Sequence, residues 1–279
     1  MTEASHRAAV AERAARAGGV VARESFRQGV PVETKKNKND LVTAADREAQ
    51  SQVVATIRQE FPSDAFILEE DAQTLAGPET DSTPPTVVDS VPDAGAAWIV
   101  DPIDGTSNFV RGVRTWATSI AAVVDGETAA ATTFMPAQED VFAAGPESVS
   151  RNDEPMTVSA RTDPETFAVS VVGWWPQSDR DAFGRVCGTL ASHLGDVRRI
   201  GSFQVTLANV ADGGLEAAVS TVPAHSWDTI AGVHLVRRAG GMVTALDGER
   251  WTPADETLIA SNGAAHDAVL DAARAATED

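Results

Sequence analysis

A short apolar segment that ends in carboxylates constrains the fold of this chain more than any other feature. Trp98, Ile99 and Val100 show no polar alternation, which is typical of a strand buried on both faces. The hexapeptide 101–106 follows, and its proline predicts that strand pairing ends there. Its last three residues, Asp-Gly-Thr, predict a helix start, because aspartate and threonine cap helices and glycine permits a tight turn. A buried strand therefore delivers Asp101 and Asp104 to one small volume.

Two aspartates in one small volume need a cation, a shared proton or separation. Two like charges about 4 Å apart repel by roughly 4 kcal/mol at an effective dielectric near 20. Mg²⁺ resolves such a conflict, because it prefers oxygen ligands and binds through one or two carboxylates, water and substrate phosphate. The alternative is a surface turn in which Asp101 and Asp104 only cap the backbone.

Two further segments place acids at the ends of regular elements. The apolar run 65–68 predicts a second strand that leads into Glu69 and Glu70. Asp228 stands in the first turn of a predicted helix that ends before the glycines at 240–241. Read alone, the first acids could form a solvated loop, and Asp228 could be an ordinary helix cap.

A third helix start is predicted at Gly201-Ser202. Phe203, Leu207 and Val210 follow at helical spacing after Ser202 as the N-cap. The N-termini of helices attract anions, so the three predicted helix starts suit a phosphate ligand. A plain surface helix is the alternative for this segment.

These motifs together resemble the inositol monophosphatase family, the magnesium-dependent and lithium-sensitive sugar phosphatases that include archaeal fructose-1,6-bisphosphatases. The resemblance runs almost from end to end of the chain. It is carried by the 41–46 segment, Glu69-Glu70, the hexapeptide with Asn108-Phe109 behind it, Trp227-Asp228, the Ala-Gly-Gly at 239–241, and the segment 258–262.

The resemblance implies an α+β fold, a layered α-β-α-β-α sandwich, and two or three Mg²⁺ ions. It implies a single catalytic domain over residues 1–279, whose first half (about 1–150) holds most metal ligands and whose second half (about 151–279) supplies Asp228. The implied ligands of the first ion are Glu69, Asp101 and the carbonyl of Ile103, those of the second are Asp101, Asp104 and Asp228, and Glu70 supports a third ion through water.

The resemblance also assigns catalytic and substrate residues. Asp46 and Thr106 resemble the pair that orients and activates the attacking water. The segment 43–46 also fits a capping box at the start of a helix, which is the structural alternative for Asp46. The expected substrate contacts are Gly105, Thr106, Gly201, Ser202 and Asp228.

The predicted activity is metal-assisted hydrolysis of a phosphate monoester. One ion lowers the pKa of a bound water, and a second stabilises the leaving oxygen. The family resemblance implies inositol 1-phosphate and fructose 1,6-bisphosphate as substrates. The chain departs from the family at Thr221, where the family has an inositol-contacting glutamate, at Phe203, where it has a small residue, and at Leu68, where it has a glycine, and these departures argue against strict specificity for inositol. Adenosine 3',5'-bisphosphate is an alternative substrate, and a catalytically silent sugar-phosphate-binding homologue is an alternative function.

Composition bears on the binding partners and the cellular location of the protein. A formal charge of -19 over 279 residues argues against nucleic acid as a partner. The few lysines, at 35, 36 and 38, form a basic cluster beside the predicted site or a solvated loop. Acid-rich, lysine-poor composition resembles that of proteins from salt-loving archaea. A lone cysteine, Cys187, and the lack of a long apolar run predict a cytoplasmic protein without a membrane span. The family resemblance implies a homodimer.

Periodicity predicts the remaining elements. Helices are expected at 8–27 and 43–60, strands at 119–124, 132–135, 157–159 and 168–173, and a long loop at 77–95.

Overall fold

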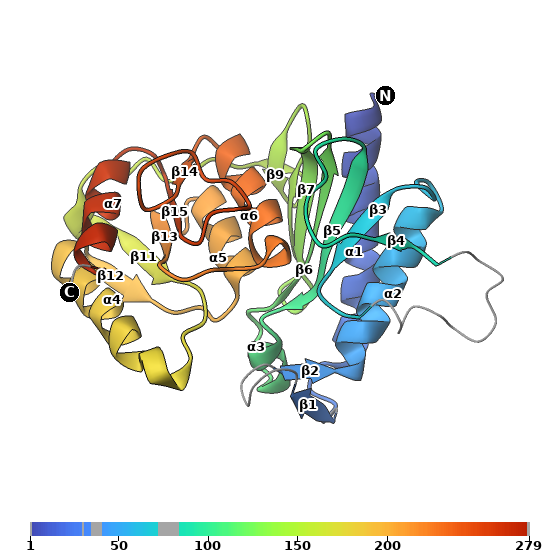
Figure 1. Ribbon diagram of the computed structural model, residues 1–279, viewed down its shortest axis with the longest axis horizontal. Helices are drawn as coiled ribbons and strands as arrows, with labels where there is room; N and C mark the ends of the chain where they lie inside the picture. The colour runs from blue at the N-terminus through green and yellow to red at the C-terminus, as the bar shows by residue number, and fades with distance from the viewer. Residues whose placement is uncertain (1, 30, 35–40, 72–83, 278–279) are drawn as a thin grey trace.

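The computed structural model describes residues 2–29, 31–34, 41–71 and 84–277. The three lysines and part of the predicted 77–95 loop lie outside these residues. The described residues form alternating layers of helices and sheets (Figure 1). This arrangement confirms the predicted layered α+β sandwich.

The first outer layer consists of two helices that cover one face of the larger sheet. They are α1 (Glu3–Ser25) and α2 (Ala44–Arg58). Alanine and valine side chains of both helices pack against the aromatic and branched side chains of the sheet. The short antiparallel pair β1 (Val32–Thr34) and β2 (Leu41–Thr43) precedes α2.

The larger sheet has the strand order β10-β9-β8-β7-β6-β5-β3-β4. β3 is parallel to β5, so the ends of these two strands that carry acids lie at the same edge of the sheet. The strands are β3 (Ala65–Leu68), β4 (Thr86–Val87), β5 (Ala96–Asp104), β6 (Ala117–Val124), β7 (Glu127–Met135), β8 (Asp140–Ala144), β9 (Val149–Arg151) and β10 (Glu154–Pro155).

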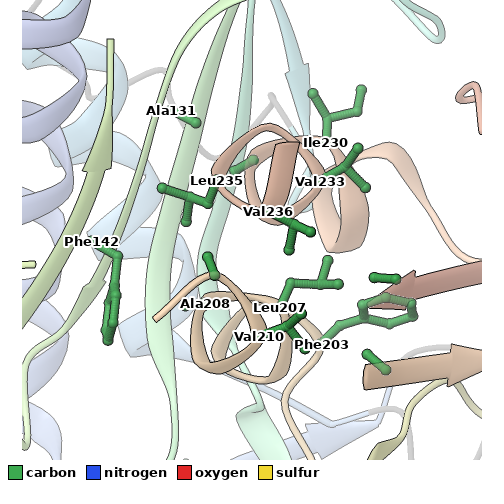
Figure 2. Close-up of a cluster of buried hydrophobic side chains, with 14 of the residues drawn as sticks. Ala131, Phe142, Phe203, Leu207, Ala208, Val210, Ile230, Val233, Leu235 and Val236 are labelled. Atoms are coloured by element: carbon green, nitrogen blue, oxygen red, sulfur yellow. The ribbon is translucent and has the colours of Figure 1, made fainter. Parts of the chain in front are cut away.

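Two helices lie between the sheets, α5 (Phe203–Ala211) and α6 (Ser226–Arg238). Figure 2 shows Leu235 of α6 directed toward the larger sheet and Phe203 of α5 directed toward the smaller one. Because both faces of these helices are covered, almost every residue of α5 is buried, including the polar Gln204 and Thr206. This middle layer forms the largest apolar cluster.

The smaller sheet has the order β12-β11-β13-β15-β14 and is covered by two outer helices (Figure 1). Its elements are β11 (Ala168–Val171), α4 (Arg180–His193), β12 (Asp196–Arg198), β13 (Ala217–Ser220), β14 (Met242–Thr244), β15 (Leu258–Ser261) and α7 (His266–Ala275). The short helix α3 (Thr106–Val110) and two 3₁₀ turns, Pro164–Thr166 and Gln177–Asp179, complete the described elements.

Most predicted elements are confirmed within a few residues, and two differ. Residues 157–159 form no strand, because the Val158 N–H donates to the carbonyl of Ala239 instead of joining a sheet ladder. The predicted 77–95 loop contains the two-residue strand β4 in its described part. Among the described helices, none is both long and apolar enough to cross a membrane.

Candidate functional site

The site begins with an irregularity in β5. The prediction that pairing ends at Pro102 is wrong, because β5 continues to Asp104. Asp101 pairs with Ser119 and Asp104 with Ala117, so β5 uses one residue more than β6 between these points. Side chains three residues apart on a regular strand point to opposite faces. The extra residue removes that alternation and allows both aspartates to reach the same place.

Three carboxylates meet at this place. One oxygen of Asp101, one of Asp104 and one of Asp228 all lie within 4.8 Å of one another. The first two come from β5 of the larger sheet, and the third comes from the first turn of α6 in the middle layer. The structure thus brings together residues that are more than a hundred positions apart, as the sequence predicts.

Asp101 is the member of the cluster that has a side-chain oxygen without a hydrogen-bond donor in the described part of the chain. Its side chain is buried, and its Oδ1 has no hydrogen-bond partner among the described residues. Burial, followed by the carboxylates of Glu69 and Asp104, raises the pKa of Asp101 well above its ordinary value. A buried oxygen without a donor, next to other acids, is the environment that a bound cation relieves.

Asp104 lies in a different environment, because the N-terminus of α5 surrounds it. Its Oδ1 accepts from the Phe203 N–H at 3.0 Å, and its Oδ2 accepts from the Gln204 N–H at 2.8 Å and from the Ser202 hydroxyl. Burial raises the pKa of Asp104, and these donors oppose the rise. The donors of α5 that were predicted to face a phosphate are therefore directed to Asp104.

Asp228 is held by the start of α6. Its Oδ2 accepts from the His225 N–H at 3.2 Å, which confirms the helix-cap geometry. Gln204 of α5 fixes this helix from the side: its amide donates to the Trp227 carbonyl at 2.6 Å and accepts from the Gly232 N–H at 2.8 Å. Cap and metal ligand are compatible roles for Asp228, because one of its carboxylate oxygens lies within 4.8 Å of oxygens of Asp101 and Asp104.

The side chains of Asp46 in α2 and Thr106 in α3 lie next to each other. The Asp46 Oδ2 accepts from the backbone and hydroxyl of Thr43, so the predicted capping box is present. Its Oδ1 lies 3.4 Å from the Thr106 Oγ1, which is also 3.0 Å from the Ile103 carbonyl oxygen. Burial, followed by Glu69, raises the pKa of Asp46 to about 7. One aspartate thus serves both as the helix cap and as the neighbour of Thr106.

A buried glutamine positions the paired glutamates. Gln50 of α2 accepts from the Glu70 N–H and donates to the Glu70 carbonyl, each at 2.9 Å. The Glu69 N–H donates to the Val100 carbonyl, which keeps this turn beside β5. The sequence interpretation missed Gln50, although a polar residue on the buried face of α2 is the signal that could have revealed it.

Gly105 allows the start of α3 to lie close to Thr115 and to Gly201, which precedes α5. Gly105 has φ +90°, and a Cβ there would lie 3.2 Å from the Thr115 carbonyl oxygen and 3.3 Å from that of Gly201. Asn108 joins the same segments, since its amide donates to the carbonyls of Thr115 and Ile200. A larger residue at position 105 would separate α3 from the start of α5.

The arrangement offers a cluster of buried oxygen ligands and, beside it, a hydroxyl next to an aspartate. Carboxylate and carbonyl oxygens of this kind suit a hard divalent cation, and the unpartnered oxygen of Asp101 fits one. A cation at this position could hold a phosphate, while Asp46 and Thr106 are placed to orient a nucleophile.

Comparison with known proteins shows what this chain is similar to. The model of the inositol monophosphatase family matches residues 3–278. A fructose-1,6-bisphosphatase/inositol-1-monophosphatase of Thermotoga maritima is 31% identical over 241 residues, which cover 86% of this chain and 84% of the relative. Nus factor SuhB of Escherichia coli K12 is 28% identical over 256 residues, covering 91% of this chain and 90% of the relative.

A solved structure extends this similarity to the fold. The Thermotoga maritima IMPase superimposes with a TM-score of 0.84 at 28% identity, covering 97% of this chain and 98% of that one. The likeness therefore includes both sheets and the helices between them.

Proposed function

The chain belongs to the inositol monophosphatase family, and we propose that it is a magnesium-dependent phosphatase that hydrolyses a sugar or polyol phosphate monoester. The observation that supports this proposal most is the cluster of buried Asp101 and Asp104 with half-buried Asp228, in which one Asp101 oxygen lacks any donor among the described residues. Such a cluster stabilises the native state poorly unless a cation neutralises it.

The proposed metal ligands follow the family pattern. Glu69, Asp101 and the Ile103 carbonyl would hold one ion; Asp101, Asp104 and Asp228 would hold a second; and Glu70 would support a third through water. Bound magnesium supplies charge neutralisation for the phosphate and lowers the pKa of water. Asp104 keeps capacity for a ligand bond, because its Oδ1 accepts from one N–H only.

Asp46 and Thr106 are the proposed catalytic pair. The Thr106 hydroxyl has one proton and lies near two acceptors, the Asp46 carboxylate and the Ile103 carbonyl. If the carbonyl is engaged as a ligand, Asp46 becomes the acceptor of that proton, and a Thr106 lone pair can accept from the attacking water. Gly105 and Gly201 complete the proposed substrate surface, whereas the Ser202 hydroxyl, an expected substrate contact, donates to Asp104 instead.

Inositol 1-phosphate and fructose 1,6-bisphosphate are the proposed substrates. The name of the Thermotoga relative pairs these two activities, which supports both. Phe203 does not crowd the substrate, because its side chain is buried between α5 and the smaller sheet and is only 7% exposed (Figure 2). Thr221 leaves the inositol contact of the family without a charged acceptor, which favours a broader substrate range.

Both halves of the chain form the proposed catalytic domain. Asp104 of the first half is bound by the N-terminus of α5 in the second half, and Asp228 of α6 completes the cluster. The homodimer and the cytoplasmic location remain predictions.

Phosphate release from a substrate panel tests the proposed function. The purified full chain is assayed with inositol 1-phosphate, fructose 1,6-bisphosphate and adenosine 3',5'-bisphosphate, with Mg²⁺ and with a chelator. We expect Mg²⁺-dependent turnover of one of the first two. Turnover of adenosine 3',5'-bisphosphate alone would select the alternative substrate. No Mg²⁺-dependent turnover of any ester would refute a phosphatase and favour a catalytically silent homologue.

The name of the SuhB relative bears on the partners of the chain. A Nus factor is a different role from phosphate hydrolysis, so a binding function is the second candidate. The formal charge of -19 keeps direct binding to nucleic acid the less favoured interpretation. Retention on an RNA or DNA column at physiological salt would contradict that interpretation.

A further inference from the structure

A hollow of about 500 Å³ lies at the end of α6 that is opposite to Asp228. Asp228 and Arg237 are nine residues apart on this helix, which corresponds to about 14 Å at 1.5 Å per residue. α6 and β14 lie side by side here (Figure 1). The lining residues come from α6, from β14 and from the turn after it: Arg237, Gly241, Met242, Val243, Thr244, Gly248 and Arg250.

Two arginines give the hollow its chemistry. Arg237 is half-buried and donates to the Trp251 carbonyl at 2.7 Å, whereas Arg250 is exposed. Within the part of the chain that the structure describes, neither forms an ion pair. Buried Arg7, in contrast, pairs with Asp64 at 2.5 Å.

The charge of these arginines is only partly balanced. Burial lowers the pKa of Arg237, and the guanidinium of Arg250 lowers it further, while the carboxylate of Glu127 acts in the opposite direction. Arg274 also touches the wall, near Gly248, but its guanidinium donates to the carbonyls of Leu246 and Asp247. Glu127 and Arg250 therefore act on Arg237 in opposite directions, and the turn that carries Arg250 also holds the acids Asp247 and Glu249.

The helix dipole does not explain both residues. Arginines in the last turn of a helix interact favourably with its C-terminal end, which accounts for Arg237 and Arg238. Arg250 lies outside the helix, on a turn paired with Thr244 of β14. Its position beside Arg237 places two like charges at one opening, which is unfavourable without an anion.

We propose that this hollow is a binding site for a small phosphate-type oxyanion, separate from the carboxylate cluster. Guanidinium groups donate paired N–H bonds that match the oxygens of phosphate, and a tetrahedral anion can be shared by two such groups. The source is free inorganic phosphate or the phosphate group of a simple ester. The site requires no metal ion, so it does not depend on the proposed activity.

Calorimetric titration of the chelator-treated full chain at low ionic strength tests the site. Inorganic phosphate and glycerol phosphate are the two probes, and the tighter of them identifies the source. Removing metal leaves bare carboxylates at the catalytic cluster, which repel both probes. We expect saturable binding of at least one probe, and weaker binding when added salt screens the charges.

Variants assign this binding to the hollow. R250Q is expected to weaken binding about tenfold, because one charge-assisted contact is lost. R237Q should also weaken binding about tenfold. If R237Q fails to fold because Arg237 is half-buried, the R250Q result alone tests the proposal, because Arg250 is exposed. R185Q is the matched control, since Arg185 is an exposed arginine on α4, without an ion pair in the described structure. Absence of saturable binding, or equal binding by R250Q and R185Q, would overturn the proposal.

Discussion

Asp101 and Asp104 are three residues apart on β5, yet they lie in opposite electrostatic environments. Asp104 faces the N-terminus of α5, whose backbone N–H groups and Ser202 hydroxyl donate to it. Asp101 faces other carboxylates, and one of its oxygens has no donor among the described residues. The comparison separates a carboxylate that the protein itself satisfies from one that an external cation has to satisfy.

The difference assigns separate tasks to the two residues. Asp104 connects the larger sheet to the middle layer, so it contributes to stability with or without a metal ion. Asp101 contributes repulsion until a cation arrives, so its retention in the core is explained by function. Replacing each with asparagine should therefore change stability and activity in different proportions.

The largest expected effect is on activity in Asp101→Asn. The proposed bridging ligand is lost, so we expect Mg²⁺-dependent turnover to fall by at least about a hundredfold. Metal-free Asp101→Asn should be no less stable than the metal-free wild type, because a buried charge beside Glu69 and Asp104 disappears. Phosphate release and chemical denaturation in the presence of chelator measure the two quantities. Marked destabilisation together with near-normal turnover would reverse the roles assigned here.

Two substitutions of Thr106 separate the role of its hydroxyl from that of its methyl group. Thr106→Ala should lower kcat by about a hundredfold, because the hydroxyl beside Asp46 is lost, while Thr106→Ser should retain most of it. Neither change removes a proposed metal ligand, so the Mg²⁺ concentration at half-maximal rate should stay the same. Equal losses in the alanine and serine variants would show that the methyl group and packing matter more than the hydroxyl.

The sequence predicted the residues of the site better than their surroundings. Acids after apolar runs indicated the carboxylate cluster, whereas the layered fold was implied by the family resemblance and not by the pattern alone. The bulge was missed because proline usually ends pairing, and only the register against β6 shows that Asp104 still pairs with Ala117. Such a register depends on the partner strand, which local pattern does not contain.

Long-range hydrogen bonds were the second feature beyond the reach of the sequence. Asp104 and Ser202 are nearly a hundred positions apart, so nothing local indicates that the α5 donors serve a carboxylate and not a phosphate. Gln50 and Gln204 clamp backbone groups of other segments in the same way. These residues position the site without belonging to any motif that spacing reveals.

Asp104→Asn tests the other side of the comparison through stability. An asparagine side chain keeps one oxygen but places an NH2 where the other oxygen was, so the N–H group of Phe203 or of Gln204 that faces the NH2 would lose its acceptor. We expect the metal-free protein to lose about 2 to 3 kcal/mol of unfolding free energy, because several charge-assisted bonds are affected. Denaturant unfolding with Asp101→Asn as the matched variant measures the difference. Equal stability of the two variants would remove the distinction between the aspartates.

The smallest expected effect is the pH dependence of stability through His234, which determines the pH at which the stabilities of the two aspartate variants should be compared. His234 lies on α6 between the sheets, and burial, with Arg238 and Arg237, lowers its pKa from 6.5 to about 4. The unfolded chain therefore binds a proton below pH 6.5 that the folded protein refuses, so acid weakens folding through this group. The contribution is complete above pH 6.5 and declines toward pH 4. Relative to His234→Gln, the wild type should lose about 1 kcal/mol between pH 7 and about 5.5, allowing for partial exposure. A constant difference in unfolding free energy across that range would contradict the lowered pKa, and the two aspartate variants could then be compared at any pH in it.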